Sequence, residues 1–167
     1  MLAESAKTSP EDGFSRTRDD DRALAELARR QHGVVSRAQL AEAGFGDGAI
    51  SSRLRRGRLH RLRSGVYAVG HQVIGREGRW MSAVLSSGRG AVLSHWSAAA
   101  LWGIRPNSRA TVDVTVPHRS RSSDSIRRHA SRLPDDERAV EAGIPVTTVP
   151  RTVLDLAAAA PLEVIEA

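Results

Sequence analysis

The stretch from Asp47 to Val69 constrains the fold most, because it joins a helical pattern to two strand patterns with almost no linker. Ile50 and Leu54 lie four residues apart, so they share one face of a helix, and Gly57 is expected to end it. Beyond the glycine the pattern predicts a hairpin, with strands at Arg58–Leu62 and Val66–Val69 and a turn at Arg63, Ser64 and Gly65. A helix followed at once by a hairpin is the layout of a winged helix-turn-helix, whose helix enters the DNA major groove.

Positive charge is concentrated in this same stretch, where the sequence places Asp47 as the nearby acid. Such a run of charge can be ordinary solvated surface or can pair with acids. Because like charges repel one another unless a polyanion is present, we predict binding to double-stranded DNA. The candidate DNA-binding residues are Ser51, Ser52, Arg53, Arg55, Arg56, Arg58, His60, Arg61 and Arg63.

Two roles are expected within this set. Ser51, Ser52 and Arg55 are predicted to face away from the core and to reach base edges or nearby phosphates. The DNA backbone is the expected target of Arg56, Arg58, Arg61 and Arg63. Tyr67 is expected to pack its ring on the core of the hairpin, with a phosphate contact by its hydroxyl as the alternative.

Three helices are expected before the hairpin. The first starts near Asp21; the second starts at a capping box formed by Ser36 and Gln39, after an extended link at residues 34–35. The third starts at Asp47, whose carboxylate is placed to accept free backbone N–H groups. Glycines that end or separate these helices are Gly33, Gly44 and Gly46.

The expected fold class is α+β, with the winged helix-turn-helix at residues 21–70 and a small α/β domain at 71–161. Residues 1–20 are polar without apolar periodicity and are predicted to be a disordered tail, and 162–167 form the C-terminal end. In the α/β domain, helices are expected at about 78–87, 94–102 and from Pro150 onward, and strands at about 91–93, 112–116, 126–130 and 146–149. Alternation of valines with polar residues along 112–116 predicts a strand with one buried face.

The composition excludes several classes of protein. The chain has 167 residues and no cysteine, so disulfides, thiolate metal sites and cysteine nucleophiles are ruled out. A net charge of +6 favours a polyanionic partner, although a genome of high GC content would also enrich arginine over lysine. No apolar run approaches the roughly 18 residues that span a bilayer, and we expect a cytoplasmic protein without a membrane partner.

No catalytic residue, metal site or cofactor is predicted. The acidic run Pro134–Glu137 has no lysine downstream, so we interpret it as a turn or helix start and not as a nuclease site. Ser94 is interpreted as a helix cap, because neither a general base nor an oxyanion hole accompanies it. The histidines lack metal-ligand spacing and are expected as surface or partly satisfied core groups; they are His32, His60, His71, His95, His118 and His129.

Residues 27–70, LARRQHGVVSRAQLAEAGFGDGAISSRLRRGRLHRLRSGVYAVG, resemble the N-terminal domain of AbiEi-type antitoxins of type IV abortive-infection systems, in the form common in actinobacteria. The later segments AVLSHWSAAALWGI, TVDVTVP and GIPVTTVPRTVLDLA are similar to the region after the winged helix in that group. The resemblance implies an antitoxin that represses its own operator through Ser51 to Arg63. It also implies a second domain that counteracts a nucleotidyltransferase-like toxin without requiring a stable complex.

Alternatives stay open at this point. Many relatives of this form continue past the PRTVLDLA segment into a restriction-endonuclease-like domain, so one alternative is the DNA-targeting accessory part of a nuclease whose catalytic domain is not in this sequence. The second domain could instead be a protein-interaction module, with the arginines binding RNA. Repressors commonly bind palindromes as dimers, but no heptad seam predicts a homodimer from these residues.

Overall fold

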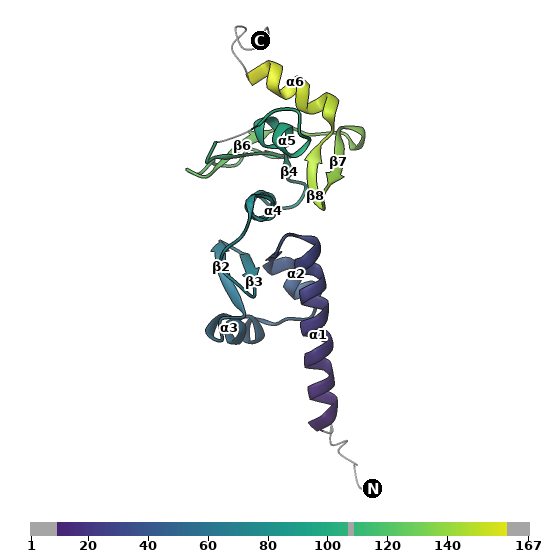
Figure 1. Ribbon diagram of the computed structural model, residues 1–167, viewed down its shortest axis with the longest axis vertical. Coiled ribbons are helices and arrows are strands. Elements are labelled where there is room, and N and C mark those ends of the chain that lie inside the picture. The colour runs from purple at the N-terminus through teal and green to yellow at the C-terminus, as the bar shows by residue number, and fades with distance from the viewer. Residues whose placement is uncertain (1–9, 107–108, 160–167) are drawn as a thin grey trace.

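The computed structural model describes the backbone of residues 10–106 and 109–159, and side chains within these ranges from residue 20 onward (Figure 1). Its helices and two sheets confirm the expected α+β class. The N-terminal half contains α1 (Pro10–Arg30), β1 (Val34–Ser36), α2 (Arg37–Glu42), α3 (Asp47–Arg55), β2 (Leu59–Arg63) and β3 (Val66–Val69). The three strands form an antiparallel sheet in the order β1-β3-β2, so the expected extended link at residues 34–35 is a paired strand.

Helix α1 corrects the prediction of a disordered tail at residues 1–20. It begins at Pro10 and not near Asp21, while the expectation for residues 1–9 lies outside the described part of the chain. Proline is favoured in the first turn of a helix, which agrees with a start at Pro10. This part of α1 extends beyond the rest of the N-terminal half (Figure 1). A helical segment without a neighbouring element needs no apolar face, so the apolar pattern of the sequence did not predict it.

Local signals set the boundaries of α2 and α3. The capping box is confirmed, since Ser36 Oγ accepts from the Gln39 backbone N–H and the Gln39 side chain accepts from the Ser36 N–H. The expected cap at Asp47 is wrong: Gly46 occupies the N-cap without a side-chain hydrogen bond. The Asp47 carboxylate instead accepts from Arg37 Nη2 at 2.7 Å, which draws it away from the helix start.

The second half begins at α4 and adds a five-stranded mixed sheet in the order β6-β5-β4-β8-β7. Its elements are α4 (Arg76–Ser86), β4 (Val92–Leu93), α5 (His95–Leu101), β5 (Val112–Val116), β6 (Ile126–Ala130), the short 3-10 helix η1 (Asp135–Glu137), β7 (Arg138–Glu141), β8 (Ile144–Thr147) and α6 (Val149–Ala159). Strand β7 was not anticipated, whereas the acidic run forms the expected turn as η1. Among the helices of the described residues, none is both long and apolar enough to cross a membrane.

Strand β5 is buried along its whole length, so the prediction of one buried face is wrong. Its valines belong to an apolar core with Trp80 and Val84 of α4. The other face of β5 presents Asp113 and Thr115 toward α5, and these polar side chains are buried as well. Helices cover both faces of this sheet (Figure 1), which is why alternating polarity there does not mean alternating exposure.

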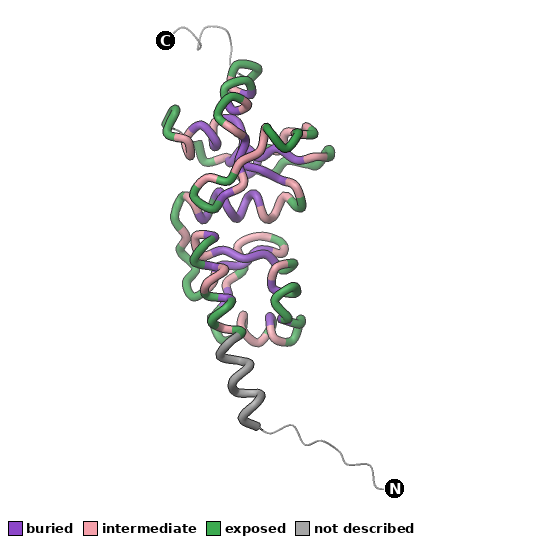
Figure 2. The backbone as a smooth tube through the Cα atoms, turned by 90° about the vertical axis from the view of Figure 1, so that its right-hand side faces the viewer, coloured by how far each residue is buried: buried purple, intermediate pink, exposed green. Residues whose placement is uncertain are grey.

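Helix α4 joins the two halves. It packs against β1, β2 and β3 on one side and against β4, β5 and β8 on the other, and Figure 2 shows it mostly buried across the middle of the molecule. Gly78 allows this approach, because a Cβ there would lie 2.9 Å from the carbonyl oxygen of His32. The halves are therefore packed together through a shared helix rather than connected by a free linker.

Candidate nucleic-acid interface

The outer face of α3 carries the polar residues that the helical pattern placed there. Ile50 is buried in the apolar core of the N-terminal half, with Leu54 packed against it. Ser51 and Arg55 occupy the exposed face, one turn apart, and Arg56 is exposed at the C-cap. Ser51 and Arg55 therefore project from one face of α3, with Arg56 at its C-terminal end.

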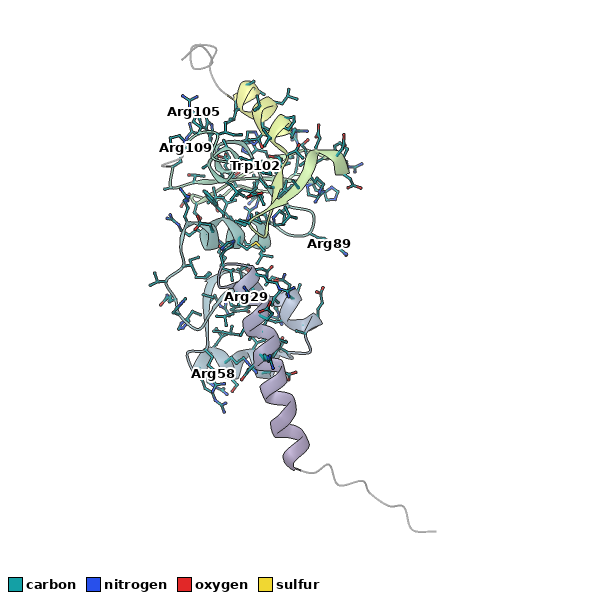
Figure 3. All side chains as sticks on the ribbon, turned by 45° about the vertical axis from the view of Figure 1, so that its right-hand side comes forward. Arg29, Arg58, Arg89, Trp102, Arg105 and Arg109 are labelled. Atoms are coloured by element: carbon teal, nitrogen blue, oxygen red, sulfur yellow. The ribbon has the colours of Figure 1, made fainter. Side chains whose placement is uncertain are left out.

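Two more exposed arginines lie beside this helix, Arg58 just before β2 and Arg61 within it. Leu59 is buried, whereas Arg58 and Arg61 are exposed and extend the basic surface from the end of α3 onto the hairpin. Figure 3 shows Arg58 pointing away from the body of the molecule near α3. Ser52 and His60 are only half-buried, and His60 Nε2 lies 3.4 Å from the Gly70 carbonyl oxygen.

Arg53, in contrast, points into the fold. Its side chain is 13% exposed, its Nη2 donates to Asp21 Oδ1, and its Cζ lies 4.4 Å from the centroid of the Phe45 ring. A guanidinium stacked on a ring and paired with a carboxylate is held in place by both contacts. The structure thus gives Arg53 an internal role, which its position in the basic run did not reveal.

Asp21 also reaches the surface arginines. Its second oxygen accepts from Arg58 Nη1 at 3.1 Å, so one carboxylate of α1 serves two members of the basic run. The expectation that Asp47 is the nearby acid is therefore incomplete, because the fold also brings Asp21 of α1 to the basic run. The Arg58 side chain remains 62% exposed, and an exposed pair of this kind contributes little to stability.

Arg63 lies at the tip of the hairpin, which faces the second half of the molecule. Its Nε donates to Ser82 Oγ at 3.2 Å and its Nη1 to Ser125 Oγ at 2.8 Å. Burial, reinforced by the nearby charge of Arg128, lowers the pKa of the Arg63 guanidinium. These contacts hold Arg63 between the two halves of the molecule. Its position therefore gives no support to the expected contact with the DNA backbone.

The exposed basic surface on α3 and β2 is the candidate interface, and it has the charge that a polyanion requires. Arg55, Arg56 and Arg61 form no ion pair with a carboxylate in the part of the chain that the structure describes. Unpaired guanidinium groups on a helix and an adjoining strand can contact phosphates and guanine edges. We define this basic face by its members, Ser51, Arg55, Arg56, Arg58 and Arg61.

A second polar cluster, unnoticed in the sequence, lies inside the five-stranded domain. The rings of His95 and His129 stack at a centroid distance of 3.6 Å, and His129 Nε2 lies 2.9 Å from Asp113 Oδ1. Burial, followed by the charge of His129, lowers the pKa of His95. Neither residue spacing nor local pattern signalled this pairing, because β5, β6 and α5 bring the groups together only in the folded state.

Helix α6 closes this cluster. Asp155 is buried, with one oxygen accepting from Arg151 Nε at 2.8 Å and the other 3.8 Å from His95 Nδ1. Ser94 is the N-cap of α5 as expected, but its side chain does not cap the helix and instead contacts His95 Nδ1 at 3.0 Å. Among the side chains that the structure describes, no group of His, Asp and Glu is arranged to hold a metal ion.

Comparison with known families finds a match within the N-terminal half. Residues 22–70 match the family described as "Transcriptional regulator, AbiEi antitoxin". The matched segment runs from within α1 to the end of β3 and contains the whole basic face. It confirms, for these residues, the resemblance to AbiEi-type antitoxins that the sequence indicated. No curated protein matches the chain.

Proposed function

We propose that this AbiEi-type regulator is a cytoplasmic DNA-binding repressor whose basic face binds its own operator. The observation that carries the proposal is that Arg55, Arg56 and Arg61 pair with no carboxylate among the described residues and lie inside the segment that matches a family of transcriptional regulators. We interpret α2, α3 and the β2–β3 hairpin as a winged helix-turn-helix within a DNA-binding domain at residues 21–70, with the second domain at 71–161.

Within this proposal α3 enters the major groove. Ser51 and Arg55 read base edges, since they project from the exposed face of α3 opposite buried Ile50. Arg56, Arg58 and Arg61 bind phosphates and fix the register of the protein on the duplex. Arg53 and Arg63 support the domain from within and contact no DNA, while Ser52 and His60 lie at the edge of the surface.

The second domain is proposed to act against a nucleotidyltransferase-like toxin. The support is the resemblance of its segments to those after the DNA-binding domain in AbiEi-type antitoxins. A stable complex with the toxin is not required for this role. On a palindromic operator two copies would bind as a dimer, each using one basic face.

The decisive experiment measures fluorescence anisotropy of the purified protein on the DNA upstream of its own gene and on a scrambled duplex of equal length. We expect binding to the upstream DNA to be at least tenfold tighter and to persist at about 150 mM salt. Equal, salt-sensitive binding to both duplexes would contradict a specific operator. Absence of binding to either would remove the DNA-binding role altogether.

Two variants divide the surface into its proposed roles. Arg55→Ala should reduce discrimination between the two duplexes, since a base contact is worth about 1–3 kcal/mol per site. Arg56→Ala should weaken binding to both duplexes alike, because phosphates carry no sequence information. Arg89→Ala, on the far half of the molecule, is the matched control and should leave both affinities unchanged. Loss of discrimination in Arg56→Ala alone would reverse the two assignments.

A further inference from the structure

A pocket of about 390 Å³ lies where the two halves meet. Its walls come from the hairpin tip, from the start of α4 and from the chain before β5 and β6. The polar residues around it are Arg63, Arg76, Arg79, Arg109 and Ser125, and its apolar floor includes Trp80. Both halves of the molecule therefore contribute to one cavity.

The charge around this pocket is positive. No carboxylate of the described residues lines it. Glu77 pairs with Arg76 at 3.4 Å, and the Arg76 guanidinium also lies over the Trp80 ring. Arg79 is exposed and pairs with no carboxylate among the residues that the structure describes. Among the residues that the structure describes, Arg63 donates hydrogen bonds to the hydroxyls of Ser82 and Ser125, and burial lowers its pKa. A partly desolvated guanidinium without a counter-charge gains from a bound anion.

We infer that this pocket binds a small organic phosphate, held by guanidinium groups from both halves of the protein. Arginine matches the paired oxygens of a phosphate. The apolar floor formed by Trp80 and Val112 suits the organic part of such a ligand. Volume and composition fit a molecule of nucleotide size or smaller.

A small ligand fits the site better than a duplex does. The pocket is concave and partly apolar, whereas phosphate contacts with DNA are made by exposed side chains that follow the outside of the duplex. Arg63 lies inside the junction with two hydroxyl partners, unlike the arginines of the basic face. Because the ligand would contact both halves, its binding would hold their relative position and stabilise the folded chain.

The test uses the full chain with adenosine monophosphate as the probe, adenosine as the control without phosphate, and sodium chloride to match ionic strength. Thermal unfolding should shift upward by about 3–6 °C at a probe concentration tenfold above Kd, with no shift for adenosine. Arg79→Gln should weaken binding at least tenfold without affecting the fold, because the Arg79 side chain is exposed and pairs with no carboxylate of the described part of the chain. Arg89→Gln, which in Figure 3 lies on the opposite side from Arg109, should bind as the parent does.

Three outcomes would overturn the inference. The first is no shift with adenosine monophosphate beyond that of chloride, and the second is an equal shift in Arg79→Gln. The third is a flatter salt dependence of DNA binding in Arg79→Gln, which would place a DNA phosphate at this pocket. The unfolding measurement contains no DNA, so its result is independent of whether the operator proposal holds.

Discussion

The carbonyl oxygen of Arg30 lies directly against the α-carbon of Gly143, so that a Cβ on residue 143 would approach it to 2.5 Å. This contact joins the end of α1 to the turn between β7 and β8. Beside it, His32 Nε2 lies 2.7 Å from the carbonyl oxygen of Ala142 and donates to it in the corresponding tautomer. Together with α4, this contact fixes the N-terminal half against the five-stranded sheet, although the residues involved are far apart in the sequence.

Gly143→Ala should therefore destabilise the protein more than an ordinary glycine substitution. The left-handed φ of +77° costs an L-residue about 1–2 kcal/mol, and the clash with the Arg30 carbonyl adds to that. Gly88→Ala is the matched control, since it has φ +93° but no atom within 4 Å of the new Cβ. Urea unfolding should show a larger decrease in the free energy of unfolding for Gly143→Ala than for Gly88→Ala. Equal decreases would mean that the contact between residue 143 and the Arg30 carbonyl rearranges without an energetic cost.

Asp21→Ala should lower the free energy of unfolding by about 1–3 kcal/mol, because Arg53 would remain mostly buried without its carboxylate. Asp47→Ala removes an ion pair whose side chains are 57% and 78% exposed, and should cost less than about 1 kcal/mol. Urea unfolding of both variants measures the difference. A loss for Asp47→Ala as large as that for Asp21→Ala would contradict the internal role of Arg53.

Gln39→Ala should cost about 1–3 kcal/mol, because this side chain serves two partners at once. It completes the capping box with Ser36, and its Nε2 donates to Gln31 Oε1 at 2.8 Å in a partly buried amide pair. Gln72→Ala, at an exposed position, provides the control and should be nearly neutral. Thermal unfolding compares the two, and a neutral Gln39→Ala would show that water replaces the amide pair.

Arg61→Ala should flatten the plot of log affinity for operator DNA against log salt by about one unit, since one phosphate contact is lost. Arg53→Ala should leave this slope unchanged and lower stability instead, because Arg53 is paired inside the fold. Anisotropy titrations over a salt series, combined with urea unfolding, separate the two effects. A flatter slope in Arg53→Ala would return that residue to the DNA-binding surface.

Stability should fall as pH drops below about 6.5, in part because of His95. Its pKa is lowered in the folded state by burial and by His129, so the unfolded chain binds more protons between the two pKa values. Asp113 and Asp155 oppose this shift, whereas Arg151 adds to it. The stability that His95 contributes is fully present at pH values above its pKa in the unfolded chain. It is lost as the pH falls toward the lower pKa of His95 in the folded protein.

His95→Asn isolates this effect, because asparagine tolerates the φ of 50° at this position. The variant should lose less stability than the parent protein when urea unfolding at pH 7 is compared with pH 5.5. The pH dependence that remains in the variant reports the other titrating groups of the protein. Identical losses in parent and variant would show that His95 does not titrate in this range.

Local features of the sequence predicted much of the N-terminal half. Three of these features act between residues only a few positions apart, so they can be interpreted from the sequence alone. They are the capping box at Ser36, the helix end at Gly57 and the apolar pair Ile50 and Leu54. For the same reason the helical pattern placed Ser51 and Arg55 on the outer face of α3. The strand pattern likewise located the hairpin.

Tertiary structure decided which charges are available to a partner. Arg53 and Arg58 share Asp21 from 32 and 37 positions away, and Arg63 reaches Ser125, separated by 62 positions. A basic run reports charge but not the direction of each side chain, and no local pattern reports a partner brought in from another element. The helical and strand patterns of the sequence thus determined which segments carry the basic face. Long-range packing determined which arginines of these segments remain exposed on it.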